Sequence, residues 1–205
     1  MRDRGLLRGP RVHRYSAVRS GRYHPTLGQR YNRLVPVATV LAALPPTVPA
    51  LIQAALAAAM DAWVVPLGPR LVSIVLFGSF ARGDATESSD VDLLVVAEGF
   101  PRRLSARRQE LLGLYAPLRE ARQLPFIEWN LVTKTPEEAR EHSPLYLDMV
   151  EDGRLLLDRA GFFAEVLERM RARMRELGSR RVFLPDGSWY WDLQPGFTFG
   201  GEVRI

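Results

Sequence analysis

The sequence predicts an α+β domain with a mixed sheet of about four strands, helices on one side of the sheet and a C-terminal β-hairpin. Three observations lead to this prediction. Continuous apolar runs rich in β-branched residues are typical of buried strands. Segments with leucines on one face and charged residues on the other are typical of helices that pack on a sheet. A Pro-Asp-Gly turn at 185–187 separates two short apolar segments and predicts the hairpin.

The first predicted helix covers residues 50–64, which are rich in alanine and leucine. Thr47 is its expected N-cap, with Pro49 in the first turn. Pro66 and Gly68 are expected to end it.

Two strands and a loop form the predicted centre of the sheet. Leu71–Phe77 is a continuous apolar run, as expected of a buried central strand. Residues 78–89 are small and polar, which predicts a loop with one helical turn. Val91–Ala97 is a second apolar run and therefore a second predicted strand.

The remaining elements follow from spacing and from helix-ending residues. Thr135 and Glu138 have the spacing of a capping box, which predicts a short helix after the third strand. The other elements predicted are a helix at 104–123, a strand at 126–133, a helix at 143–150, an edge strand at 155–157, an amphipathic helix at 162–177 and hairpin strands at 182–184 and 188–191.

The chain divides into three predicted regions. Residues 1–46 form a basic arm and a proline-rich linker, residues 47–160 the main domain, and residues 161–205 a helix with an aromatic hairpin. The net charge of +5 belongs to the arm, since residues 1–33 hold nine arginines and one acid while the rest of the chain is slightly acidic. The arm is interpreted either as an electrostatic contact for nucleic acid or as a poorly ordered tail. No nucleic-acid contact is expected elsewhere.

Composition also limits the chemistry and the location. The chain has no cysteine and only three scattered histidines, which excludes disulfides, thiol nucleophiles and zinc sites of the usual types. Metal chemistry would therefore depend on carboxylates, which select hard ions such as Mg²⁺ or Mn²⁺. Val48–Val65 is the most apolar stretch, but Gln53 and Asp61 interrupt it, and Leu6–Leu7 is too short for a secretory signal. We expect a cytoplasmic protein without membrane contact.

The segment from Gly78 to Asp92 carries the predicted chemistry. A buried strand runs directly into Gly78-Ser79, where a backbone without side-chain bulk can approach an anion. Asp90 and Asp92 follow at the start of the next strand and point to the same face, with Cα atoms about 6–7 Å apart. Carboxylates so placed can share two divalent ions about 3.5–4 Å apart. The combination indicates metal-assisted phosphoryl or nucleotidyl transfer.

These motifs resemble the DNA polymerase β-like nucleotidyltransferase superfamily. Leu-Phe-Gly-Ser-Phe-Ala-Arg-Gly at 76–83 and Ser-Asp-Val-Asp-Leu-Leu-Val at 89–95 are similar to its minimal nucleotidyltransferase (MNT) branch. The resemblance implies the polymerase-β-like fold, ATP as substrate and two Mg²⁺ ions, or Mn²⁺, held by Asp90 and Asp92. It also implies that Gly78 and Ser79 hold the β- and γ-phosphates.

Two further side chains are assigned less directly. The superfamily uses a third carboxylate on a later strand, and Glu128 is the candidate, as a metal ligand or as the general base. Arg82 is interpreted either as a phosphate ligand or as a salt-bridge partner of a nearby acid. Weaker carboxylate candidates are Glu98, Asp148 and Glu151. A P-loop lysine pattern is absent from the sequence, which excludes that class of kinase.

The resemblance also suggests an acceptor. MNT proteins are commonly paired with HEPN-domain toxins, and some act as antitoxins by transferring AMP to a toxin tyrosine. A HEPN-domain toxin is therefore the expected partner. The alternatives are a small-molecule nucleotidyltransferase of the aminoglycoside type and a non-catalytic binding antitoxin. Trp189 and Trp191 are expected on one strand face, where they cover the domain's own core in preference to contacting a partner.

Overall fold

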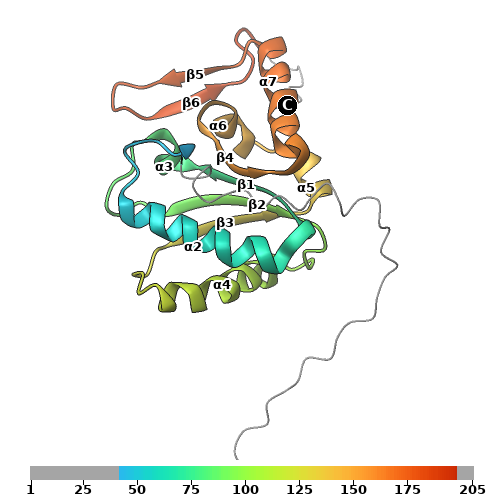
Figure 1. Ribbon diagram of the computed structural model, residues 1–205. Coiled ribbons are helices and arrows are strands. Elements are labelled where there is room, and N and C mark those ends of the chain that lie inside the picture. The colour runs from blue at the N-terminus through green and yellow to red at the C-terminus, as the bar shows by residue number, and fades with distance from the viewer. Residues whose placement is uncertain (1–41, 198–205) are drawn as a thin grey trace, which may run out of the picture. The chain divides into compact units, whose positions relative to one another are not determined.

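The computed structural model describes residues 42–197, so all but the last five residues of the predicted arm and linker at 1–46 lie outside the described residues. Its centre is a four-stranded sheet in the order β3-β2-β1-β4 (Figure 1). β1 pairs antiparallel with both β2 and β4, whereas β2 and β3 are parallel. The predicted α+β fold with a mixed sheet is confirmed, and β4 lies at an edge as expected. The strands are β1 Leu71–Phe77, β2 Val91–Ala97, β3 Trp129–Lys134 and β4 Arg154–Asp158.

Helices cover both faces of this sheet, so the prediction of helices on one side was wrong. β1 and β2 are buried at nearly every position, and their alternate side chains belong to two separate hydrophobic clusters. A strand that is apolar on both faces needs cover on both. One face packs against α2 (Ala50–Leu67) and α4 (Leu104–Ala121), and the other against α5 (Pro136–Arg140), α6 (Leu145–Asp152) and α7 (Phe162–Leu177).

The helix α2 differs from its prediction at both ends. Its N-cap is Pro49 and no side chain caps it, so the prediction of Thr47 as N-cap was wrong. The helix also continues past Pro66 to Leu67, and its C-cap is Gly68, whose φ of 52° is unfavourable for other residues. Among the described helices, α2 alone is long and apolar enough to cross a membrane by length and composition. Buried core helices pass the same test, and Trp63 of α2 is buried with its Nε1 donating to the Leu111 carbonyl at 2.8 Å.

The strand β3 begins three residues later than predicted. Phe126 was expected inside it but is 81% exposed. The neighbouring strand β2 starts at Val91, which lies opposite Trp129. Residues before Trp129 therefore have no residue of β2 opposite them. One hydrogen bond precedes the paired region, from the Val91 N–H to the Glu128 carbonyl at 2.9 Å.

The predicted helical turn, capping box and hairpin are present. A single turn, α3 (Gly78–Arg82), follows β1. Thr135 and Glu138 form the capping box at α5. The hairpin consists of β5 (Arg180–Phe183) and β6 (Trp189–Asp192), which form a separate two-stranded sheet beside α6 and α7 (Figure 1). Its strands begin and end within two residues of the predicted bounds.

Candidate active site

The turn after β1 lies directly against Asp92. Phe77 is opposite Asp92 in the β1–β2 register, so the following residue, Gly78, meets the aspartate side chain. Gly78 has a φ of 70°, and a Cβ placed there would lie 2.8 Å from Cγ of Asp92. Both the backbone conformation and the space require glycine. The backbone of this turn therefore comes within contact distance of a carboxylate.

The start of α3 presents backbone donors at the same place. Ser79 is half-buried, and its carbonyl accepts from Gly83 N–H at 2.9 Å and from Asp84 N–H at 3.1 Å. These bonds close the turn. The first N–H groups of a helix have no partner within the helix and can face an anion.

Asp90 and Asp92 stand at the end of the sheet, one residue before and one inside β2. Both are half-buried. Asn130 of β3 lies opposite Asp92, and its Nδ2 donates to Asp92 Oδ1 at 2.7 Å. The pKa of Asp92 is raised, mainly because the group is partly buried. The negative charge of Asp90 raises this pKa further, whereas the hydrogen bond from Asn130 and the positive charge of Arg82 lower it in part. The pair thus holds negative charge in a partly dehydrated place, where a cation would be favoured.

Glu128 is the third carboxylate predicted for this site, and it lies just before β3. The Glu128 carbonyl accepts a hydrogen bond from Val91 N–H, so in the β2–β3 register Glu128 lies beside Asp90. Its side chain is exposed. No three acidic or histidine side chains of residues 42–197 gather closely enough to hold a metal ion together. The donors that fit a hard cation here are therefore Asp90 and Asp92, and the role of Glu128 stays a prediction.

Arg82 has contacts in two directions. Its Nε donates to Asp84 Oδ2 at 3.0 Å, which is the salt bridge weighed against phosphate binding. Its guanidinium also lies over the ring of Trp189, 4.7 Å from the ring centroid. The salt bridge to Asp84 is compatible with phosphate binding by Arg82, since neither this salt bridge nor the contact with Trp189 uses the terminal nitrogens of the guanidinium.

The weaker carboxylate candidates have other places. Asp148 accepts from Trp191 Nε1 at 2.9 Å and from Arg181 at 3.4 Å, so it holds the hairpin to α6. Glu98 lies beyond the opposite end of β2, and Glu151 lines a different cavity. Sequence reasoning did not find Asn130 or the contact of Trp189 with Arg82. A polar residue inside the β3 run was the available signal for Asn130.

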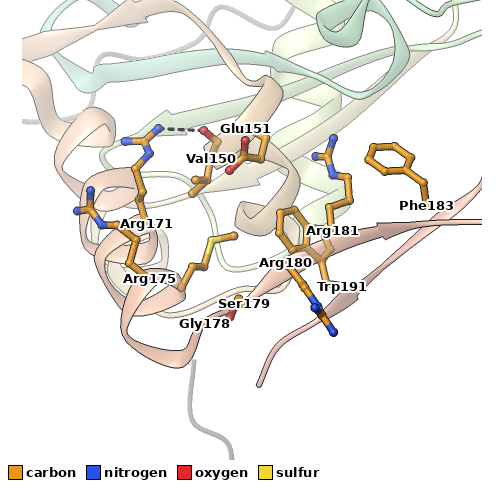
Figure 2. A pocket seen from close by; sticks show the side chains of 11 residues that line it. Val150, Glu151, Arg171, Arg175, Gly178, Ser179, Arg180, Arg181, Phe183 and Trp191 are labelled. Atoms are coloured by element: carbon orange, nitrogen blue, oxygen red, sulfur yellow. Dashed lines mark hydrogen bonds between the residues drawn. The ribbon is translucent and has the colours of Figure 1, made fainter. Parts of the chain in front are cut away.

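Two cavities lie in the described part of the chain, and neither is lined by Asp90 or Asp92. One, of about 390 Å³, lies between the start of α2 and the 83–89 loop and is lined by Phe80, Gly83 and Ser89 among others. The other, of about 450 Å³, lies between α6, α7 and the hairpin (Figure 2). Its lining combines four arginines with Trp191 and Phe183.

Comparison with known proteins gives one family and two kinds of relative. The nucleotidyltransferase domain family matches residues 66–157. A Methanocaldococcus jannaschii protein named "Putative protein adenylyltransferase MJ1305" is 34% identical over 117 residues, which are 54% of this chain and 74% of the relative. A second protein of that organism with the same functional name, MJ0604, is 59% identical over 29 residues, 14% of this chain and 29% of its own.

Solved structures with a similar chain include two complexes. One is a toxin–antitoxin complex with AMP-PNP, with a TM-score of 0.38, 22% identity, and coverage of 58% of this chain and 90% of that chain. Another is a tri-AMPylated Shewanella oneidensis HEPN toxin with its MNT antitoxin, with a TM-score of 0.34, 20% identity, and coverage of 60% and 92%. The family assignment depends on the domain match and on the M. jannaschii relative. On those two matches the resemblance predicted from the motifs is confirmed, and the chain belongs to the nucleotidyltransferase domain family.

Proposed function

We propose that this protein is a Mg²⁺-dependent adenylyltransferase that transfers AMP from ATP to a tyrosine hydroxyl of a HEPN-domain toxin and so acts as its antitoxin. The observation that carries the proposal is the contact of the Gly78 turn with Asp92, beside Asp90. It joins a backbone suited to phosphates to a carboxylate pair suited to a hard cation. The name of the M. jannaschii relative, a protein adenylyltransferase, supports a protein acceptor.

Separate residues of this chain bind the phosphates and the metal ion in the proposed reaction. The backbone at Gly78 and Ser79 receives the β- and γ-phosphates, and Arg82 neutralises part of their charge. Asp90 and Asp92 would hold the Mg²⁺, with Asn130 fixing the orientation of Asp92. When bound, Mg²⁺ supplies charge neutralisation at the triphosphate and lowers the pKa of the acceptor hydroxyl.

The transfer is one displacement at the α-phosphorus. The acceptor oxygen forms a bond to phosphorus, the bond from phosphorus to the bridging oxygen breaks, and pyrophosphate leaves. Glu128, exposed beside Asp90, is the group that we propose takes the hydroxyl proton. The product is a phosphodiester between AMP and the acceptor.

The test uses ATP labelled at the α-phosphate, Mg²⁺ and a purified HEPN-domain partner. We expect label on a partner tyrosine, and a loss of at least ~10²-fold with Asp90→Asn, because a charge-stabilising group at the transferred phosphate is removed. Asp61→Asn is the matched control, because Asp61 of α2 makes a half-exposed ion pair with Arg122, the C-cap of α4. Glu128→Gln, with Glu98→Gln as its control, separately tests the third carboxylate.

Two results would contradict the proposal. Transfer of label to an aminoglycoside in place of the protein would show a small-molecule enzyme. Full neutralisation of the toxin by Asp90→Asn would show an antitoxin that acts by binding alone.

A further inference from the structure

The hairpin reaches the candidate nucleotide site through one aromatic ring. Trp189 of β6 lies under the guanidinium of Arg82, at 4.7 Å from ring centroid to Cζ. Arg82 uses its Nε for Asp84, and within the described residues its two terminal nitrogens have no hydrogen-bond partner. Because a cation–π contact uses the face of the guanidinium, the in-plane N–H groups stay available for phosphate oxygens.

Trp189 is linked to α6 through Arg181. Arg181 of β5 lies 5.2 Å from the Trp189 ring and 5.1 Å from the Trp191 ring. Its guanidinium is bound to Asp152 of α6 at 2.7 Å, and Trp191 Nε1 is bound to Asp148 at 2.9 Å. Figure 2 shows Arg181 and Trp191 on the hairpin side of the cavity beside α6. Two neighbours of Trp189 in the hairpin, Arg181 and Trp191, are therefore each bound to α6.

Arg82 ends the same single turn, α3, whose first residue Gly78 lies against the Asp92 side chain, so the guanidinium belongs to the turn that we propose binds the phosphates. An arginine side chain has many rotamers, and a ring face restricts them before a ligand arrives. The hairpin lies outside residues 66–157, which match the nucleotidyltransferase domain, so the family match by itself does not predict this contact.

We infer that Trp189 is a positioning residue that holds Arg82 for the triphosphate, so that the C-terminal hairpin completes the nucleotide site. The inference rests on the proposed function, because it assigns ATP to this site. The alternative role for Trp189 is to stabilise the hairpin without any effect on nucleotide. A double-mutant cycle with Arg82 separates the two, because a residue that acts through Arg82 has no effect once Arg82 is removed.

The experiment measures ATP binding by calorimetry for the full chain with Mg²⁺, together with the thermal unfolding midpoint. Trp189→Ala is expected to raise the Kd for ATP about 3- to 10-fold, the range of a partly buried cation–π contact. The same substitution in an Arg82→Ala background is expected to leave the Kd unchanged. Tyr190→Ala is the matched control, because Tyr190 lies on the same strand but is 52% exposed on its other face.

Trp189→Phe and Trp189→Leu provide a second comparison if the alanine variant folds poorly. Phe keeps an aromatic face under Arg82 and is expected to keep most of the affinity, whereas Leu fills similar space without one. Equal Kd values for wild type, Trp189→Ala and Trp189→Leu would overturn the inference, as would an equal loss in the Arg82→Ala background. A wild-type protein that binds no ATP would instead overturn the proposed function, and the inference with it.

Discussion

At the scale of single residues, the site depends on close packing around one carboxylate. Asp92 lies between the Gly78 turn on β1 and Asn130 on β3. Gly78 leaves no room for a side chain, and Asn130 fixes one carboxylate oxygen. Small changes on either side therefore move the group that we propose binds the metal.

Gly78→Ala should impair transfer more than it impairs folding. The left-handed backbone costs alanine about 1–2 kcal/mol, and the added methyl displaces the Asp92 side chain. A misplacement of about 1 Å at a catalytic group can cost ~10²-fold, which is the loss of transfer rate expected. Transfer assays and thermal unfolding measure the two effects.

Gly113→Ala is the control for that substitution. A Cβ at Gly113, inside α4, would meet no atom within 4 Å. This variant should be more stable by about 0.5–1 kcal/mol and fully active. Full activity of Gly78→Ala would show that the turn does not set the position of Asp92.

Sequence motifs predicted some of the site and missed the rest for a physical reason. Gly78, Asp90 and Asp92 are close in sequence, so spacing and strand geometry bring them together. Asn130 reaches Asp92 only through the β2–β3 register, and Trp189 reaches Arg82 from a distant hairpin. Such contacts depend on tertiary structure, which no local pattern specifies.

At the scale of elements, apolar patterning fixed the ends of β1, β2 and α7 correctly. It failed where an end is determined by a neighbour. β3 starts only where β2 offers a partner, and α2 continues past Pro66 because the last turn of the helix still packs through buried Leu67. The two-sided cover of the sheet follows from strands that are apolar on both faces, which the sequence does contain.

The helices α4 and α5 are joined by an ion pair between buried Arg107 and half-exposed Glu138, which should make stability depend on pH. Arg107 is 2% exposed, and its Nη2 lies 2.8 Å from Glu138 Oε1. The Arg107 hydrogen bond lowers the pKa of Glu138 to about 2, below its ordinary value of 4.5. The stability that the pair contributes is therefore complete above about pH 4.5 and is lost as the pH falls toward 2.

Glu138→Gln tests this ion pair. At neutral pH the free energy of unfolding should fall by about 1 kcal/mol, because Arg107 loses its counter-charge but solvent at the 40%-exposed Glu138 screens the pair. The variant should also lack the part of the acid destabilisation between pH 4.5 and about 2 that Glu138 causes. Denaturant unfolding at several pH values measures both. Glu165→Gln, which breaks an exposed pair with Arg169 on α7, should change little; equal effects of the two substitutions would contradict the assignment.

At the scale of the whole molecule, charge and catalytic chemistry belong to different parts of the chain. Residues 1–33 hold nine arginines and one acid, and the rest of the sequence is slightly acidic. The motif residues all lie in the acidic part. Removal of the basic residues at the start of the chain should therefore leave nucleotide transfer intact.

A chain lacking residues 1–33 should keep ATP-dependent transfer within about twofold and lose salt-sensitive retention on an anionic polymer, because polyanion affinity follows the number of basic contacts. Heparin chromatography at increasing salt measures retention, and the labelling assay measures transfer. Loss of transfer on deletion would show that the arm contributes to acceptor binding.

The burial of the Asp92 carboxylate also affects the stability of the fold and the proposed activity in opposite directions. Because burial raises the pKa of Asp92, the ionised group disfavours the fold at neutral pH. Asp92→Asn should therefore unfold at a higher temperature than the wild type in the absence of metal while losing transfer, and calorimetry with EDTA would show it. An unchanged or lower midpoint would mean that the carboxylate causes no strain. The protein thus keeps a destabilising charge at the end of its sheet, a cost that selection for stability alone would remove.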